Sequence, residues 1–166
     1  MTRDDYESGV GRDDGMELRV WLRLITCHNL MDGAVRQKLH HDHDTTLPRF
    51  DVLAQLHREG APLTMGELSR RLMVTNGNVT GLIDRLAREG LVERRPAPDD
   101  RRRQLVAMTD RGRAFFETMA DDHKGWIADM TDDLNAGEMR ELFRLLGRLK
   151  HSILTAHDED NSEAAE

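Results

Sequence analysis

The feature that most limits how this chain can fold is a pair of short helix patterns, with a tight turn between them, within residues 64–90. The first begins at Thr64-Met-Gly-Glu67, where the hydroxyl and the carboxylate have the spacing of a capping box. The second follows Thr75 and ends at Gly90. Its apolar residues recur at Val79, Leu82, Ile83 and Leu86. Two short helices joined by a turn of about three or four residues form a helix-turn-helix.

A strand-like pair follows this motif directly. Residues 91–96 and 105–108 have the pattern of two short strands, and the loop 97–103 between them contains three consecutive arginines. The sequence therefore predicts a β-hairpin with a basic tip, which is a wing beside the helix-turn-helix. Amphipathic helix patterns flank this region at 18–39, 47–59, 110–130 and from 134 onward.

The charge is divided unevenly along the chain. Residues 60–113 contain 11 arginines and 7 acidic residues, whereas the whole chain has a formal net charge of −7. A basic middle segment in an acidic chain is typical of a module that binds a polyanion. An acidic, polar start and the lack of any apolar run of about 20 residues argue against a membrane protein, and we expect the chain to be cytoplasmic.

The second helix of the motif has the composition of a DNA-reading helix. Its outward positions are small and polar, where an ordinary solvated face would carry Lys and Glu. Asparagine can pair with an adenine edge, and threonine can contact a base or a thymine methyl group. We expect base contacts from Asn76, Asn78 and Thr80 and phosphate contacts from Thr75, Arg85 and Arg94. The wing residues Asp100, Arg101, Arg102 and Arg103 are expected to reach the minor groove.

At this point the sequence resembles the MarR family of winged helix-turn-helix transcription factors. The resemblance is strongest over residues 63–112. The matching residues are Leu63-Thr64, Glu67-Leu68, Val74, Gly77, Val79-Thr80, Leu82, Asp84, Leu86, Gly90-Leu-Val92, Arg94, Asp100-Arg101-Arg102, Thr109 and Gly112. Gly81 stands where many members have an arginine, and Met108 replaces a leucine.

The resemblance implies a mainly α fold with a small β-hairpin wing: a winged helix-turn-helix lobe plus a helical dimerisation region. We expect a flexible N-terminal tail over 1–16, a dimerisation helix and loop over 17–46 and the DNA-binding lobe over 47–112. Dimerisation helices over 113–155 and an acidic disordered tail over 156–166 complete the expected organisation.

The family implies a homodimer on a pseudo-palindromic operator of double-stranded DNA, acting as a repressor of a nearby operon and released by a small ligand. The segment 70–86 is similar to a branch that controls hydroxycinnamate and other aromatic-acid catabolism. This similarity implies an aromatic acid or aromatic acyl-CoA thioester as effector and no cofactor. The residues expected to line the effector site are Arg19, Trp21, Arg23, His28, Arg49, Phe50, Met119 and Trp126.

Three alternatives stay open at this level. Cys27 could be a redox switch, although a packed cysteine is the simpler expectation. The cluster His40-His41-Asp42-His43-Asp44 could bind zinc with help from Cys27 or His123, although a solvated loop is the simpler expectation. From another functional class, a small cytoplasmic enzyme would need an acidic and histidine cluster such as Asp121-Asp122-His123, which is expected instead to be a solvated face.

Overall fold

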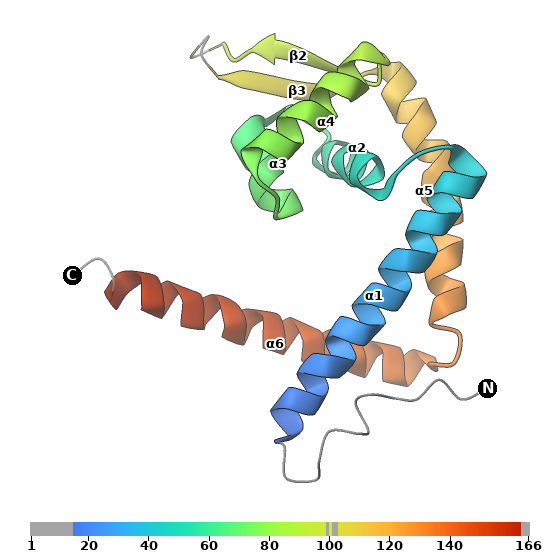
Figure 1. Ribbon diagram of the computed structural model, residues 1–166, viewed down its shortest axis with the longest axis vertical. Coiled ribbons are helices and arrows are strands. Elements are labelled where there is room, and N and C mark those ends of the chain that lie inside the picture. The colour runs from blue at the N-terminus through green and yellow to red at the C-terminus, as the bar shows by residue number, and fades with distance from the viewer. Residues whose placement is uncertain (1–14, 99, 101–102, 164–166) are drawn as a thin grey trace. The chain divides into compact units, whose positions relative to one another are not determined.

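The computed structural model describes residues 15–98, 100 and 103–163, with the side chains of residue 76 and of 157–163 left aside. The elements are α1 (Met16–His43), α2 (Leu47–Glu59), β1 (Leu63–Thr64), α3 (Met65–Leu72), α4 (Asn76–Arg88), β2 (Val92–Pro96), β3 (Gln104–Met108), α5 (Asp110–Met130) and α6 (Ala136–Glu163). The chain divides into two compact units, one ending at Trp126 and one beginning at Ile127. Figure 1 shows the helices and the small sheet, which confirm the predicted mainly helical fold with a wing.

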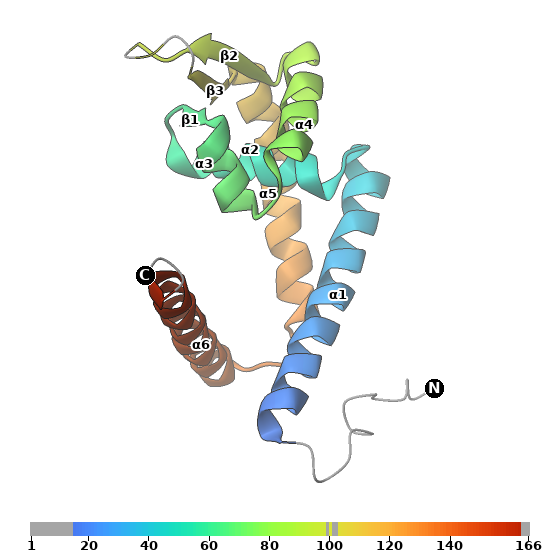
Figure 2. The same cartoon turned by 60° about the vertical axis from the view of Figure 1, so that its left-hand side comes forward.

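The sheet of the first unit is the predicted hairpin with one further strand. Strands β2 and β3 are antiparallel, with Val92 opposite Met108 at one end and Pro96 opposite Gln104 at the other. The additional strand β1 pairs with β3, so that the order is β1-β3-β2. Figure 2 shows β1 directly before α3. A strand of two residues has no detectable sequence period, and only its position beside β3 makes it a strand.

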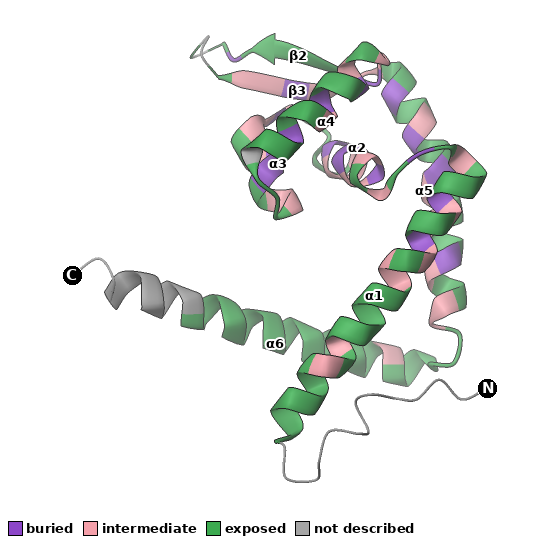
Figure 3. Ribbon diagram, in the orientation of Figure 1, coloured by how far each residue is buried: buried purple, intermediate pink, exposed green. Residues whose placement is uncertain are grey.

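The core of the first unit lies where α2, α3 and α4 meet β3. Figure 3 shows the buried positions on the inner faces of these helices. The fully covered side chains include Val52, Leu53, Leu68, Val79, Ile83, Leu86 and Val106. The apolar period of α4 read from the sequence is therefore confirmed as its buried face. This burial fixes which face of α4 remains available to a partner.

The helix-turn-helix begins as the sequence predicts. The Thr64 side chain accepts a hydrogen bond from the Glu67 amide, and the Glu67 carboxylate accepts one from the Thr64 amide. Helix α3 ends at Leu72, and its C-cap residue Met73 has a left-handed backbone at φ 53°. Residues other than glycine rarely adopt this conformation, so we attribute it to the turn into α4. Thr75 then takes the N-cap position of α4, but its side chain makes no capping hydrogen bond to the described residues.

A close backbone contact joins the end of α4 to the start of α5. Thr109 Oγ1 donates to the Gly90 carbonyl at 2.7 Å and accepts from the Gly112 amide at 3.0 Å. A Cβ atom on Gly112 would lie 1.9 Å from the Leu91 carbonyl oxygen. Glycine is therefore required here by the approach of two backbone segments.

The second unit consists of the end of α5, a turn and α6. A capping box begins α6: Asn135 Oδ1 accepts from the Glu138 amide at 3.1 Å, and the Glu138 carboxylate accepts from the Asn135 amide at 2.9 Å. Over 136–156, the part of α6 whose side chains are described, none is buried. The helix runs to Glu163 and so extends into the segment 156–166, where we expected a disordered tail; the disorder of that tail stays a prediction. Helix α1 likewise begins at Met16, and residues 1–14 of the predicted N-terminal tail lie outside the described part.

Cys27 corrects another expectation. We expected a packed cysteine, but its side chain is exposed on α1. The physical reason is that α1 contributes only Val35 and Leu39 to the buried core, both in its C-terminal half. The N-terminal turns of α1 are left uncovered by the described residues of the first unit.

Candidate nucleic-acid interface

The exposed face of α4 is small and polar, as the sequence predicts. Thr75, Gly77, Asn78, Thr80 and Gly81 are all exposed. Asn76 is the first residue of the helix, and its side chain lies outside the described set. A Cβ atom on Gly77 or Gly81 would meet no described heavy atom within 4 Å. The face is thus narrow and open, which lets a helix approach the floor of a groove.

Arg94 of β2 is engaged with α4. Its Nη2 atom lies 2.9 Å from Asp84 Oδ1 and donates to the Thr80 carbonyl oxygen at 3.3 Å. The guanidinium therefore holds strand β2 of the wing to helix α4. Sequence reasoning assigned Arg94 a phosphate and missed this tether, although the ten-residue separation of an acidic and a basic residue across a helix end is a usable signal.

The wing tip is only partly described. The Asp100 carbonyl oxygen accepts from the Arg103 amide at 2.9 Å, and the Arg103 carbonyl oxygen accepts from the Ala97 amide at 2.9 Å. Both Asp100 and Arg103 are exposed. Arg101 and Arg102, which carry much of the predicted minor-groove contact, lie outside the described residues. Arg85 is also exposed, near the end of α4.

The residues expected to line an effector site are spread over three helices. Phe50, Met119 and Trp126 are buried core residues. Phe50 packs against Phe116 and His123, with ring centroids 5.3 Å and 4.7 Å apart. Trp21 is 59% exposed on α1. Among the others, Arg19 and Arg23 border a small hollow of about 80 Å³, Arg49 lines a larger cavity, and His28 is exposed.

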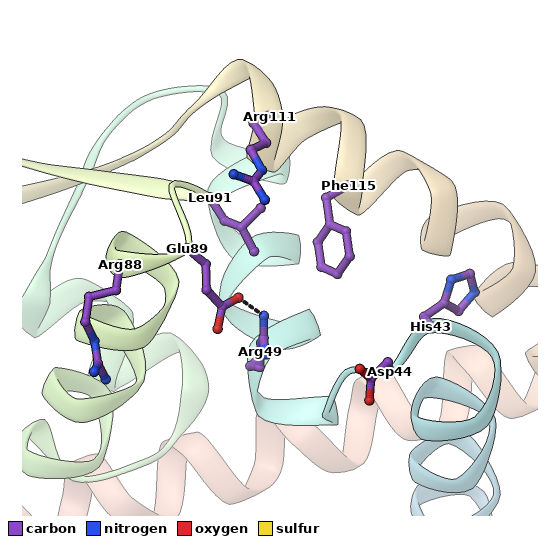
Figure 4. A pocket seen from close by; sticks show the side chains of 8 residues that line it. All are labelled: His43, Asp44, Arg49, Arg88, Glu89, Leu91, Arg111 and Phe115. Atoms are coloured by element: carbon purple, nitrogen blue, oxygen red, sulfur yellow. Dashed lines mark hydrogen bonds and ion pairs between the residues drawn. The ribbon is translucent and has the colours of Figure 1, made fainter.

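The larger cavity, of about 590 Å³, is lined by His43, Asp44, Arg49, Arg88, Glu89, Leu91, Arg111 and Phe115. Figure 4 shows that these side chains come from the end of α1, the start of α2, the end of α4 and the start of α5. Arg49 forms an ion pair with Glu89. The Arg49 Nε atom is buried and has no hydrogen-bond partner among the described residues. No sequence signal unites these residues, because they come from four separate elements.

The residues considered for a zinc site or an enzyme active site each contact a separate neighbour. His41 contacts the neighbouring Asp42 at 2.6 Å, and His43 contacts Asp122 of α5 at 3.0 Å. Asp121 pairs with Lys124 at 2.9 Å. His123 packs on Phe50 and Trp126, and burial lowers its pKa. The described residues contain no group of three or more His, Cys, Asp or Glu side chains arranged to hold a metal ion.

Among the titratable groups of the described residues, Asp51 on α2 has the largest shift in pKa. Burial raises its pKa to about 6, an effect that Arg36 opposes and Asp32 reinforces. Asp32 itself has a lowered pKa, because it accepts a hydrogen bond from Arg36 Nε at 2.6 Å. The three groups lie on α1 and α2, away from α4, and we assign them to the stability of the helix junction.

The fold and the exposed face of α4 define a winged helix-turn-helix protein that binds DNA. No helix in the described residues is both long and apolar enough to cross a membrane. The model of the MarR family matches residues 43–103. The transcriptional activatory protein BadR of Rhodopseudomonas palustris is 30% identical over 170 residues, covering 99% of this chain and 97% of that protein.

Solved structures agree with this assignment. A MarR mutant from E. coli in complex with operator DNA is 32% identical, with a TM-score of 0.71, covering 80% of this chain and 95% of that one. BpsR of Bordetella bronchiseptica, in a structure on regulation of its DNA binding by 6-hydroxynicotinic acid, is 25% identical, with a TM-score of 0.69 and coverage of 80% and 98%. This chain belongs to the MarR family of winged helix-turn-helix transcriptional regulators.

Proposed function

We propose that this chain is a cytoplasmic, homodimeric repressor that leaves a pseudo-palindromic operator when it binds a small aromatic acid or an aromatic acyl-CoA thioester. The observation that carries the DNA-binding part is the exposed face of α4, where small polar residues stand on a helix whose opposite face is fully buried. Base contacts come from Asn76, Asn78 and Thr80. Phosphate and minor-groove contacts come from Thr75, Arg85, Arg94, Asp100, Arg101, Arg102 and Arg103.

The uncovered apolar side chains of α6 support the dimer. Phe143 is 81% exposed, and Leu142, Leu145, Leu146, Leu149, Ile153 and Leu154 are also exposed. A helix is stabilised in water mainly by packing of its apolar face, and α6 has no buried residue among those described. A second copy of the chain supplies the same apolar residues. Two α4 helices then fit half-sites about one helical turn apart.

Sedimentation equilibrium tests the dimer. We expect the mass of two chains at micromolar concentration, and a shift toward one chain in Leu146→Asp. Arg144→Ala is the control, because Arg144 is exposed and pairs with Glu141 at 2.6 Å within α6. A wild-type chain that sediments as a monomer at these concentrations contradicts the proposal.

The Arg49 cavity supports an anionic effector with an aromatic ring. Arg49, Arg88 and Arg111 offer cationic groups, and Phe115 offers an apolar surface. A ligand carboxylate would compete with Glu89 for Arg49. Because Glu89 is the C-cap residue of α4, this competition would loosen the hold of α2 on the recognition helix. Release from DNA requires only that the ligand bind the DNA-free conformation more tightly.

A thermal-shift screen of aromatic carboxylates and their CoA thioesters tests the effector. A ligand at 100 times its Kd adds about 2.7 kcal/mol of stability. The shift should be lost in Arg49→Gln and kept in Arg58→Gln, since Arg58 is exposed and contacts Gln55 on the same helix. A hit should also dissociate the DNA complex. If no compound in the panel gives a shift, the effector proposal fails while DNA binding stands.

The direction of control is tested with the region upstream of the gene fused to a reporter. Deleting the gene should raise transcription if the protein represses. A fall in transcription would instead indicate an activator, as the name of BadR states for that relative.

A further inference from the structure

A continuous series of ring contacts joins α5 to α1 and α2 in the first unit. The Phe50 ring of α2 lies 5.3 Å from the Phe116 ring and 4.7 Å from the His123 ring, both on α5. The contacts continue from Phe116 to His57 of α2 at 4.8 Å, from His123 to Trp126 at 6.3 Å, and from Trp126 to His43 of α1 at 5.9 Å. We call this set the ring series; in order of contact, its members are His57, Phe116, Phe50, His123, Trp126 and His43.

The two histidines at the ends of the ring series each have a carboxylate within reach. His43 Nε2 lies 3.0 Å from Asp122 Oδ2, and His57 Nε2 lies 3.9 Å from Glu117 Oε1. A proton on either imidazole therefore lies close to an opposite charge on α5. Mild acidification leaves these two contacts between helices in place.

His123 differs from the end members, because it has no carboxylate partner among the described residues. It is half-buried between Phe50, which is 5% exposed, and Trp126, which is 8% exposed. Burial lowers the pKa of its imidazole. A protonated His123 must either stay between these rings without a counter-charge or leave them for water.

The other ionisable groups of the three helices at this place do not supply that counter-charge. The Lys38 ammonium of α1, which lies 5.5 Å from the centre of the Trp126 ring, is itself positive. The Asp51 carboxyl of α2 takes up a proton on mild acidification, because burial raises its pKa to about 6. The carboxylates of α5 around His123 are engaged in the pairs His43–Asp122, His57–Glu117 and Lys124–Asp121.

We propose that the ring series is an acid-sensitive junction, in which a proton on His123 breaks its contact with Phe50 and thereby weakens the binding of the protein to DNA. Helix α2 packs against α3 and α4, so Phe50 connects the middle of α5 to the core of the winged lobe. The start of α5 stays tied to this lobe through Thr109, so the lobe turns about that point when the contact is lost. The two α4 helices of a dimer are then no longer held at one spacing. The inference rests on the proposed dimeric binding to an operator.

The direction of the pH effect separates this junction from ordinary electrostatics. Protonation of exposed histidines adds positive charge, which strengthens binding to a polyanion, and such histidines are His28, His40, His41 and His151. Protonation of Asp51 relieves the cost of its burial, so it stabilises the fold. The neutral His123 ring contributes fully above about pH 6.5, and its contribution is lost as the pH falls through its lowered pKa. Weaker binding on acidification is therefore the effect expected of His123.

Fluorescence anisotropy between about pH 8 and pH 5.5, at fixed ionic strength, provides the first test. The probe is a duplex that the wild-type protein selects from random DNA at the higher pH. Wild-type affinity should fall several-fold across this range, by up to about tenfold per subunit for each pH unit below the pKa of His123. His123→Phe and His123→Gln cannot be protonated, and their affinity should stay constant or rise as the pH falls.

His41→Gln is the matched control. The His41 side chain is 86% exposed and contacts only the neighbouring Asp42 among the described residues, at 2.6 Å, so this variant should keep the wild-type fall in affinity. An equal fall in wild type and in both His123 variants would overturn the junction. A wild-type affinity that stays flat or rises on acidification would also overturn it.

Measurements without DNA keep the junction testable apart from operator binding. The wild-type melting temperature should fall on acidification by more than that of His123→Gln, and parallel curves would overturn the junction. An NMR titration of the wild-type imidazoles needs no variant: the pKa of His123 should lie below the ordinary value of 6.5, and a pKa at or above it would overturn the junction. A wild-type protein that binds no duplex at about pH 8 would overturn the proposed operator binding instead.

Discussion

Replacing Gly81 by alanine should stabilise the protein and weaken its binding to DNA. Gly81 lies in the middle of α4, on its exposed face, and a Cβ atom there would meet no described heavy atom within 4 Å. The free protein thus offers no steric reason for glycine at this position. If the reason is close approach to a groove floor, stability and binding must change in opposite directions.

The magnitude of each effect follows from the geometry. Glycine inside an exposed helix costs about 1 kcal/mol relative to alanine, so Gly81→Ala should gain about that amount. For a chain of this size, such a gain raises the melting temperature by about 2–4 °C. If Gly81 makes this close approach, although many members of the family carry an arginine at this position, the added methyl group pushes α4 outward. The loss of one base contact costs about 1–3 kcal/mol, or roughly 5- to 150-fold in affinity.

Two measurements on the same samples suffice. One is thermal unfolding, and the other is fluorescence anisotropy at fixed salt with a duplex that the wild-type protein selects from random DNA, called here the selected duplex. Gly125→Ala on α5 is the matched control, because its Cβ atom would also meet no described heavy atom within 4 Å and it lies outside the helix-turn-helix. It should gain similar stability and keep the wild-type affinity. Unchanged DNA affinity in Gly81→Ala, with the stability gain present, would refute the close-approach argument.

Three other substitutions follow from the structure. Gly112→Ala should destabilise the fold by about 1–3 kcal/mol or more in urea unfolding, since its Cβ atom would lie 1.9 Å from a backbone oxygen; an unchanged free energy of unfolding would contradict this. Asp51→Asn should stabilise the protein at pH 7 and not at pH 4. Because burial raises the pKa of Asp51 to about 6 in the folded protein, the stability that its protonated carboxyl contributes is fully present below the pKa of the unfolded chain and is lost as the pH rises through about 6. Allowing for partial exposure, the gain in stability of Asp51→Asn at pH 7 is about 1 kcal/mol. Parallel curves of stability against pH for the two proteins would speak against this prediction. Arg102→Ala should weaken binding to the selected duplex by about 1–3 kcal/mol in a gel-shift titration, and unchanged affinity would remove Arg102 from the interface.

The local elements were predictable because their signals are local. The capping boxes at Thr64 and Asn135, the apolar face of α4 and the basic hairpin each depend on residues within a few positions of one another. Such interactions form within one turn or one strand pair, and a sequence pattern records them directly. The exposed polar face of α4, which we propose reads DNA, is what remains when the apolar face is buried.

Composition is a weaker guide to how far each helix extends and what covers it. Helix α6 runs to Glu163, eight residues into the acidic segment for which composition predicts a disordered tail. Cys27 was expected to pack because cysteine is usually buried, yet the first turns of α1 have no covering partner among the described residues. Composition alone does not determine whether a given helix face is covered by another part of the protein.

What the sequence determined by itself is the motif and the face that it presents, since both depend on periods of a few residues. The tertiary structure alone decided which distant groups meet: Arg94 with Asp84, and Arg49 with Glu89. These pairs lie on different elements, and the packing of the helices fixes their distances. No periodicity encodes such a distance, because it depends on how the core side chains fill the space between helices.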